Sequence, residues 1–422
     1  MSFFYGAARL RLTLSLFALA WGSFAYAENP HDAKTQQIFQ TMVVVGDSLS
    51  AGFQNFSLFD SSVVVPGFPT QPLGGQKQGY AALVAKQAGA SLVQPLISYP
   101  GVPPALSLNA GQITRGTITG ARENPGVQAY NLSVPGFTVA DALAHPFPGD
   151  STNAIDAMSD LVQGLPGAIG VPVPLGCGPL PAAVLPPMST PSAFGVSEVA
   201  CAIGLQPSII LVSIGNNDAL QALTLGIPPT PAGAFATQFA ALIGALSLTG
   251  AKLVVSNVPD VSVVPYLVPV PAFTALCGAP PLGAKDSDFV VLDITNPTPT
   301  SFNLCTNYVV RPKALIDSAK ASVSAYNIII QTLTQLNHGV LVDVNGLLNQ
   351  IAQNGYNAGG HNLTTAYMGG IFSLDAIHPT NTGYAILANE VIKTMNRQLG
   401  TVVPPLSIEQ VAATDPLVPP KH

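Results

Sequence analysis

The sequence is poor in charged side chains. Asp, Glu, Lys and Arg together make up 9% of its 422 residues, and acidic residues outnumber basic residues by 21 to 15. A protein that binds nucleic acid through phosphate contacts needs a patch of Lys and Arg, and the sequence offers none. This composition therefore argues against a nucleic-acid partner.

Aromatic residues are scarce as well. They account for 7% of the chain, and the single tryptophan, Trp21, lies near the N-terminus. A row of Trp and Tyr whose ring faces could stack on sugars is therefore missing from the rest of the chain. This absence argues against a carbohydrate substrate, although it does not exclude one.

Long apolar runs are rare, and the one that stands out lies at the N-terminus. Arg9 and Arg11 precede the apolar residues 12–21, and the small residues at 25–27 follow. This order predicts a secretory signal peptide over residues 1–27, because the run is short for an anchor of ~20 residues. The whole chain has 39 Gly and 39 Pro, and these residues interrupt the apolar stretches that follow. We therefore expect a mature chain without a transmembrane segment, either soluble or in peripheral contact with lipid.

Cysteine occurs only four times, at Cys177, Cys201, Cys277 and Cys305. The even number in a chain with a predicted signal peptide favours disulfides and export, to the periplasm or the medium. Sequential pairing, Cys177 with Cys201 and Cys277 with Cys305, would close two inserted loops. The other two connectivities stay open, and the spacings do not resemble a zinc site.

Strand-like and helix-like segments alternate after the signal peptide, which predicts a parallel sheet covered by helices on both faces. The predicted strands are Val43–Val45, Val127–Leu132, Ser208–Ile214, Lys252–Ser256 and Val340–Val344. The predicted helices are Tyr80–Ala90, Thr138–Ala144, Ala234–Leu248, Ala314–Leu336 and Gly383–Leu399. Two Pro- and Gly-rich insertions, at about 146–207 and 257–312, interrupt a catalytic domain predicted over 28–400, and a Pro-rich tail, 401–422, is predicted to be extended.

Ser48 follows directly on the first strand, in Gly46-Asp47-Ser48-Leu49. Open α/β sheets place their chemistry at the carboxyl ends of strands, so we interpret Ser48 as a nucleophile. The alternative is that Ser48 caps the helix after it, since Ser is a favoured N-cap residue. The rest of the chain must decide between the two.

A serine nucleophile needs a base, a group that orients the base, and donors for the oxyanion. His378 is the best base, because Asp375 lies three residues before it, within reach through a local turn. The candidate oxyanion donors are the backbone N–H groups of Ser48 and Gly136 and the side-chain amide of Asn217. Gly136 could alternatively serve only a turn, and Asn217 could cap a helix.

In this order, Gly46-Asp47-Ser48-Leu49, Gly136, Gly215-Asn216-Asn217-Asp218 and Asp375-Ala376-Ile377-His378 resemble the four sequence blocks of the SGNH hydrolases, also called the GDSL esterase/lipase family. The resemblance implies a flavodoxin-like three-layer α/β/α sandwich with a five-stranded parallel sheet. It also implies ester hydrolysis without cofactor or metal. Ser48 would be the nucleophile, His378 the base, Asp375 its orienting acid, and Ser48, Gly136 and Asn217 the oxyanion hole.

The leading hypothesis is therefore an exported esterase or lipase that acts on a small-molecule or lipid ester. The same site would serve a polysaccharide O-deacetylase, and a non-catalytic binding protein could use the same scaffold. The long insertion at 146–207 is interpreted as a lid over an apolar substrate, or alternatively as a surface embellishment.

Overall fold

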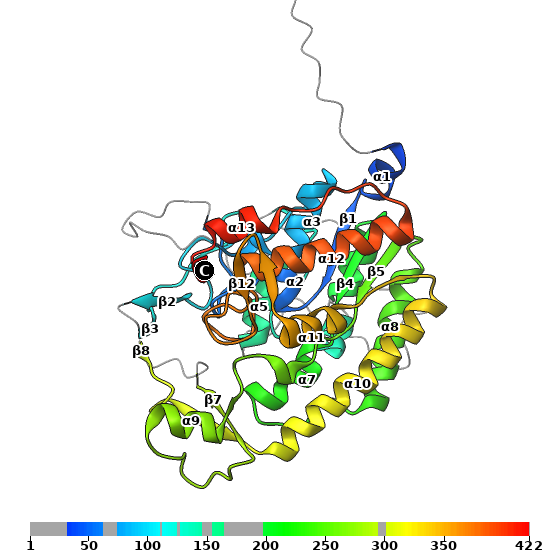
Figure 1. Ribbon diagram of the computed structural model, residues 1–422. Helices are drawn as coiled ribbons and strands as arrows, with labels where there is room; N and C mark the ends of the chain where they lie inside the picture. The colour runs from blue at the N-terminus through cyan, green and yellow to red at the C-terminus, as the bar shows by residue number, and fades with distance from the viewer. Residues whose placement is uncertain are drawn as a thin grey trace, which may run out of the picture. The chain divides into compact units, whose positions relative to one another are not determined.

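A parallel sheet lies at the centre of the computed structural model (Figure 1), which describes residues 32–61, 74–109, 112–124, 127–145, 154–163, 197–293 and 301–421. These residues belong to one unit, His31–His422. The predicted signal peptide, Cys177 and most of the insertion at 146–207 lie outside the described residues. Within the described part, no helix is both long and apolar enough to cross a membrane.

The central sheet has four parallel strands in the order β1-β4-β5-β10. They are β1 Met42–Gly46, β4 Ile209–Ser213, β5 Lys252–Ser256 and β10 Val340–Val342. Val44 lies opposite Leu211, which in turn lies opposite Val254. β1 and β4 are buried along their whole length, as β-branched strands covered on both faces should be. The parallel arrangement brings the carboxyl ends of all four strands to one edge.

The predicted fifth strand, Val127–Leu132, is not confirmed as a strand. It forms only an isolated parallel bridge beside Val44, whose N–H and C=O each bond to it. The next N–H on the same side of β1, that of Gly46, donates instead to the side-chain carboxyl of Glu198. Glu198 thus takes one N–H that a continuous ladder would use, although the N–H of Val134 still donates to the carbonyl of Gly46 at 3.1 Å. The described residues form a four-stranded sheet in place of the predicted five-stranded one.

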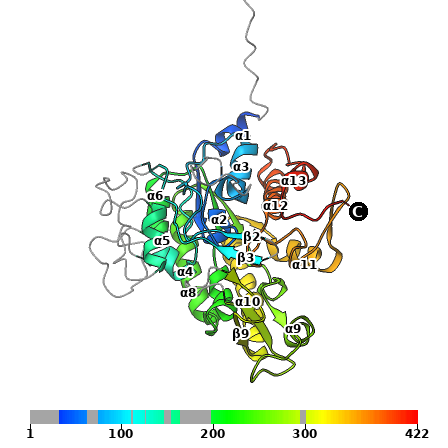
Figure 2. The ribbon, with the colours of Figure 1, turned by 90° about the vertical axis from the view of Figure 1, so that its left-hand side faces the viewer.

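Helices cover both faces of this sheet (Figures 1 and 2). One face carries α3 Tyr80–Ala88 and α12 Asn381–Leu399, which pack together. The other carries α4 Val139–Ala144, α6 Glu198–Gly204, α8 Ala232–Ser247 and α10 Lys313–Leu336, which form a second packed group. The three-layer arrangement agrees with the predicted fold class, and these helices other than α6 match the predicted ones to within a few residues at each end.

The shorter helices mark turns and connections. They are α1 Ala33–Ile38, α2 Ser48–Ala51, α5 Ala154–Gln163, α7 Asn216–Thr224, α9 Val270–Cys277, α11 Val344–Asn354, and the 3₁₀ turns η1 Gln76–Gln78 and η2 Val261–Val263. Three of them start at the edge of the central sheet where its strands end: α2 begins after β1, α7 after β4 and α11 after β10.

The second insertion and its surroundings build small antiparallel sheets. Their strands are β2 Leu106–Asn109, β3 Gln112–Arg115, β6 Val268–Pro269, β7 Phe289–Leu292, β8 Ser301–Phe302 and β9 Tyr308–Arg311, paired in the orders β2-β3-β8 and β6-β7-β9. A disulfide joins Cys277 to Cys305 across this insertion. Cys201 is also disulfide-bonded, whereas the pairing predicted for it involves Cys177, outside the described residues.

Two expectations about the ends of inserted and terminal segments are wrong. The insertion predicted at 146–207 ends in α6, which is a core helix with Val199 and Cys201 fully buried. The tail predicted to be extended contains α13 Ile408–Thr414, capped by the Ser407 side chain and packed on α12. In both cases a short apolar stripe, too brief to stand out among Gly and Pro, is buried against a larger helix. A last hairpin, β11 Tyr356–Ala358 with β12 His361–Leu363, precedes the loop that leads into α12.

Candidate active site

The turn between β1 and α2 is built around Asp47. Its carboxylate accepts the N–H of Leu49 at 3.1 Å and caps α2, and it also accepts the side-chain amide of Asn216 at 2.7 Å. Asp47, not Ser48, is therefore the N-cap residue. The alternative role considered for Ser48 as a cap is wrong, because Ser48 is the first residue inside the helix and its hydroxyl bonds elsewhere.

Ser48, His378 and Asp375 form one hydrogen-bonded chain. The distance from Ser48 Oγ to His378 Nε2 is 2.8 Å, and that from His378 Nδ1 to Asp375 Oδ2 is 3.0 Å. The three side chains come from the end of β1 and from the loop before α12, 330 residues apart in the chain. All three residues are buried. The hydroxyl thus meets a base whose other nitrogen faces a carboxylate, which is the arrangement that activates a serine.

Asp375 is held in its ionised form by its surroundings. Burial alone would raise the pKa of Asp375, but the charge of His378 and hydrogen bonds to the carboxylate outweigh it, and its pKa lies below the ordinary value. Oδ1 accepts the backbone N–H groups of Ile377 at 2.9 Å and His378 at 2.8 Å. Oδ2 accepts the N–H of Phe56 at 2.6 Å beside His378 Nδ1. A carboxylate with this many donors keeps one orientation.

The predicted oxyanion donors follow three neighbouring segments at the same edge of the sheet. Gly136 follows the segment that lies beside β1 and has a φ of 94°, a conformation that favours glycine. The side-chain amide of Asn217 donates one N–H to the carbonyl of Phe137 at 2.9 Å, which ties Asn217 to the turn that contains Gly136. An amide nitrogen carries two N–H groups, so one remains for a ligand. Asn217 does not cap α7, because Gly215 is the N-cap residue there.

Buried carboxyls surround this edge. Burial raises the pKa of Asp47 to about 6, and it raises that of Asp218 to about 6 as well. Burial also raises the pKa of Glu198 well above the ordinary range, and its second carboxyl oxygen has no hydrogen-bond partner among the described residues. Glu198 was not singled out from the sequence, since a single Glu in a predicted loop carries no signal.

The described residues offer no group of three His, Cys, Asp or Glu side chains that could hold a metal ion. Among the polar side chains at this edge, Ser48, His378 and Asp375 form the hydrogen-bonded chain.

The sequence model of a family described as GDSL-like lipase/acylhydrolase matches residues 42–391, most of the chain. The chain belongs to this family. The match spans all four sequence blocks, from the strand before Ser48 to the helix after His378. A comparison with curated proteins finds no match.

Solved structures that resemble this chain are distant. An α/β hydrolase, LAE5, from the metagenome of Lake Arreo in Spain has 12% identity and a TM-score of 0.36, covering 84% of this chain and 94% of its own. The esterase EstA from Pseudoalteromonas sp. has 12% identity and a TM-score of 0.34, covering 85% and 98%. The acetylxylan esterase Axe2 from Geobacillus stearothermophilus has 12% identity and a TM-score of 0.36, covering 85% and 93%. At such low scores these likenesses say nothing about substrate.

In this member of the GDSL-like family the structure brings Ser48, Asp375 and His378 into direct contact and ties Asn217 to the turn of Gly136. A further segment contacts the same residues and was not singled out from the sequence: the turn at Gln54–Ser57, whose backbone reaches Asp375. The only feature of the sequence that could have indicated this turn is an Asn in a short segment after a one-turn helix.

Proposed function

We propose that this protein hydrolyses carboxylic esters through an acyl-enzyme intermediate on Ser48. The observation that carries the proposal is the chain of two hydrogen bonds from Ser48 Oγ through His378 to Asp375. A serine hydroxyl at its ordinary pKa is a weak nucleophile, and an imidazole at 2.8 Å can take its proton as it attacks. The lipase and acylhydrolase activities for which the family is named support the same conclusion.

The proposed reaction has two steps. In the first, His378 takes the proton of Ser48 as Oγ attacks the ester carbonyl, and the negative charge forms on the carbonyl oxygen. The N–H groups of Ser48 and Gly136 and the amide of Asn217 donate to that oxygen. His378, now protonated and held by the ionised Asp375, gives its proton to the leaving alcohol. In the second step His378 activates water, which releases the acid.

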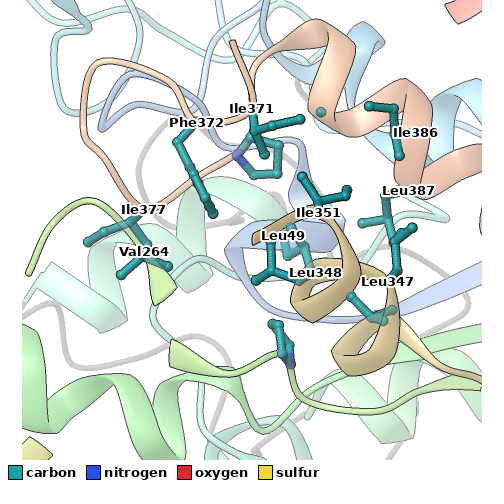
Figure 3. A pocket seen from close by; sticks show the side chains of 14 residues that line it. Leu49, Val264, Leu347, Leu348, Ile351, Ile371, Phe372, Ile377, Ile386 and Leu387 are labelled. Atoms are coloured by element: carbon teal, nitrogen blue, oxygen red, sulfur yellow. The ribbon is translucent and has the colours of Figure 1, made fainter. Parts of the chain in front are cut away.

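An apolar pocket beside the proposed site favours an aliphatic group in the substrate. It is lined by Leu49, which follows Ser48, and by Ile377 and Pro379, which flank His378. Figure 3 shows that aliphatic side chains of α11 and α12 close the opposite walls. The fourteen lining residues are Leu49, Pro259, Val264, Val344, Leu347, Leu348, Ile351, Ile371, Phe372, Ile377, Pro379, Gly383, Ile386 and Leu387. The lining contains no polar side chain.

The size of this pocket favours a short chain. Its volume is about 90 Å³, whereas an engineered apolar cavity of roughly 150 Å³ binds benzene. Each buried methylene contributes about 0.8 kcal/mol, so filling the pocket with a few carbons would favour such esters over acetates. The carbon-only lining gives no support to the alternative of a polysaccharide O-deacetylase, whose sugar would need hydrogen-bonding partners.

We also propose that the protein is exported. A disulfide between Cys277 and Cys305 agrees with folding in an oxidising compartment. The signal peptide predicted at residues 1–27 lies outside the described residues and stays a prediction. Mass spectrometry of the secreted or periplasmic protein would reveal whether the mature N-terminus is Glu28.

Hydrolysis of p-nitrophenyl esters from acetyl to palmitoyl, by the wild type and by Ser48→Ala, tests the proposal. We expect the wild type to prefer short chains above acetyl and the variant to lose the activity, with folding checked by circular dichroism. A folded wild type that hydrolyses none of the esters, or a variant that keeps the wild-type rate, would refute it. A fluorophosphonate probe that labels the wild type alone would give independent support.

A further inference from the structure

A tight turn follows α2 and faces the loop that carries Asp375 and His378. The backbone N–H of Gln54 donates to the carbonyl of Ser57 at 2.9 Å, and the N–H of Ser57 donates back at 3.0 Å. The two central residues, Asn55 and Phe56, have φ angles of 52° and 57°. Positive φ at both positions is the mark of a type I′ turn, in which Asn-Gly is preferred.

Phenylalanine at the second position is unusual, because a bulky residue is strained in the left-handed region. Left-handed backbone at a non-glycine residue persists where surrounding contacts determine it. Here the contacts are with residues 373–375 of the loop that carries Asp375 and His378. The N–H of Asn55 donates to Ser373 Oγ at 3.1 Å, and its side-chain oxygen accepts the N–H of Leu374 at 3.0 Å.

Phe56, the residue after Asn55, also bonds to this loop. The N–H of Phe56 donates to Asp375 Oδ2 at 2.6 Å, the same oxygen that faces His378 Nδ1. Two consecutive residues of the turn thus bind three consecutive residues of the loop. Because the turn lies only a few residues after Ser48, one short segment carries both the nucleophile and the anchor of its acid.

The residues before the turn hold the far side of the same loop. The side-chain amide of Gln54 donates to the carbonyl of Pro379 at 3.2 Å. The ring of Phe53 lies against the imidazole of His378, with ring centroids 4.8 Å apart. His378 is therefore bracketed by contacts to the segment that begins at Ser48, on the Asp375 side and on the Pro379 side.

We propose that Asn55 is a positioning residue for the acid–base pair, acting through the Phe56 N–H and the Leu374 N–H to fix Asp375 against His378. The inference rests on the proposed ester hydrolysis. Asn55 touches neither substrate nor reacting atoms, and it is 4% exposed. Two properties of Asn55 are needed. Its amide oxygen accepts the N–H of Leu374. Its tolerance of positive φ keeps the turn, which aims the N–H of Phe56 at Asp375 only while both central residues stay left-handed.

The test compares two substitutions that separate these properties. Asn55→Ala removes the side-chain acceptor and disfavours positive φ, whereas Asn55→Gly removes the acceptor and keeps the turn. A matched control is Asn357→Ala, because Asn357 also accepts a backbone N–H, that of Gly360 at 3.3 Å, in a hairpin that contacts none of the proposed catalytic residues. Thermal unfolding of each variant separates lost folding from lost positioning.

We expect kcat for a short p-nitrophenyl ester to fall about 10²-fold in Asn55→Ala, with KM within about twofold of the wild type, since misplacement of a catalytic group by about 1 Å costs a loss of that size. Asn55→Gly should lose less, and Asn357→Ala should keep kcat. In proton NMR, the downfield resonance of His378 Nδ1–H should be present in the wild type and lost in Asn55→Ala.

Two outcomes would overturn the inference. One is an Asn55→Ala protein that keeps both kcat and the downfield resonance. The other is a loss of kcat in Asn55→Ala and Asn357→Ala alike, in step with their loss of thermal stability. A wild type that hydrolyses no ester would refute the proposed function instead, and the resonance in the wild type and in Asn55→Ala would still decide whether the turn holds Asp375 against His378.

Discussion

Replacing Asn217 by alanine should lower kcat by ~10²–10³, which corresponds to about 2.7–4 kcal/mol of transition-state stabilisation. One amide N–H of Asn217 is already used, because it donates to the carbonyl of Phe137 at 2.9 Å. The second N–H is the one we assign to the oxyanion. Its loss removes a donor that acts only once charge has formed on the carbonyl oxygen, so KM should change little.

The substitution also leaves the carbonyl of Phe137 without the amide of Asn217. A lost hydrogen bond of this kind costs about 1 kcal/mol of folding stability, which should appear in thermal unfolding and not in kcat. Gln221→Ala, on the same helix α7, is a useful control, because the Gln221 amide donates to the carbonyl of Pro228 at 2.6 Å and not to a residue of the proposed site. Both variants remove an amide side chain from α7, and only Asn217→Ala removes a proposed oxyanion donor.

The assay is steady-state hydrolysis of p-nitrophenyl butyrate, with burst-phase measurement of acylation. Labelling by a fluorophosphonate should slow in parallel with kcat, since its phosphoryl oxygen uses the same donors. A rate for Asn217→Ala within about threefold of the wild type would refute the assignment of Asn217 to the oxyanion hole. A drop in Gln221→Ala equal to that in Asn217→Ala would refute it too, because the loss would then come from disturbing α7.

Two further predictions concern pH and chain length. Because the folded-state pKa of Asp218, about 6, lies above its ordinary value of 3.8, protonation of Asp218 favours the fold below pH 4, and this contribution is lost as pH rises through 6. Asp218→Asn keeps an acceptor for the Val139 N–H but cannot ionise. In urea titrations, the fall in unfolding free energy from pH 4 to pH 7 should therefore be smaller in this variant than in the wild type, by about 2–3 kcal/mol. A fall equal to that of the wild type would contradict this prediction. Leu348→Trp should fill the apolar pocket and lower the butyrate-to-acetate ratio of kcat/KM by about fourfold per excluded methylene. The control Gln350→Trp, at an exposed position of α11, should leave this ratio unchanged. Equal ratios in the two variants would argue against the pocket as the site of the acyl chain.

Much of the fold could be predicted from periodicity, because long helices and buried strands repeat their pattern over many residues. β5 and α10 are examples, matched to within a residue. The expected fifth strand could not be judged this way. Its residues have the strand pattern, but whether they pair fully depends on Glu198, a side chain from a helix more than sixty residues later that takes one ladder N–H.

The candidate site was predictable where chemistry requires particular residue types at short spacing. Asp375 and His378 are three residues apart, and the turn between them is local. Asn55 and Phe56 were not predictable, because their role depends on a left-handed backbone that nothing in the residue types requires. Phe56 acts through a backbone N–H, which every residue except proline possesses.

The carboxyl of Glu198 has a consequence for anyone who wishes to shorten this protein. The insertion predicted at 146–207 looks dispensable in the sequence, yet its last helix supplies the acceptor for the N–H of Gly46, two residues before Ser48. Trimming the whole stretch would strip the catalytic strand of that partner and expose Val44 and its neighbours. A viable deletion would also have to keep α5, whose Val162 is fully buried in the core, and would therefore have to fall between Gln163 and Ser197.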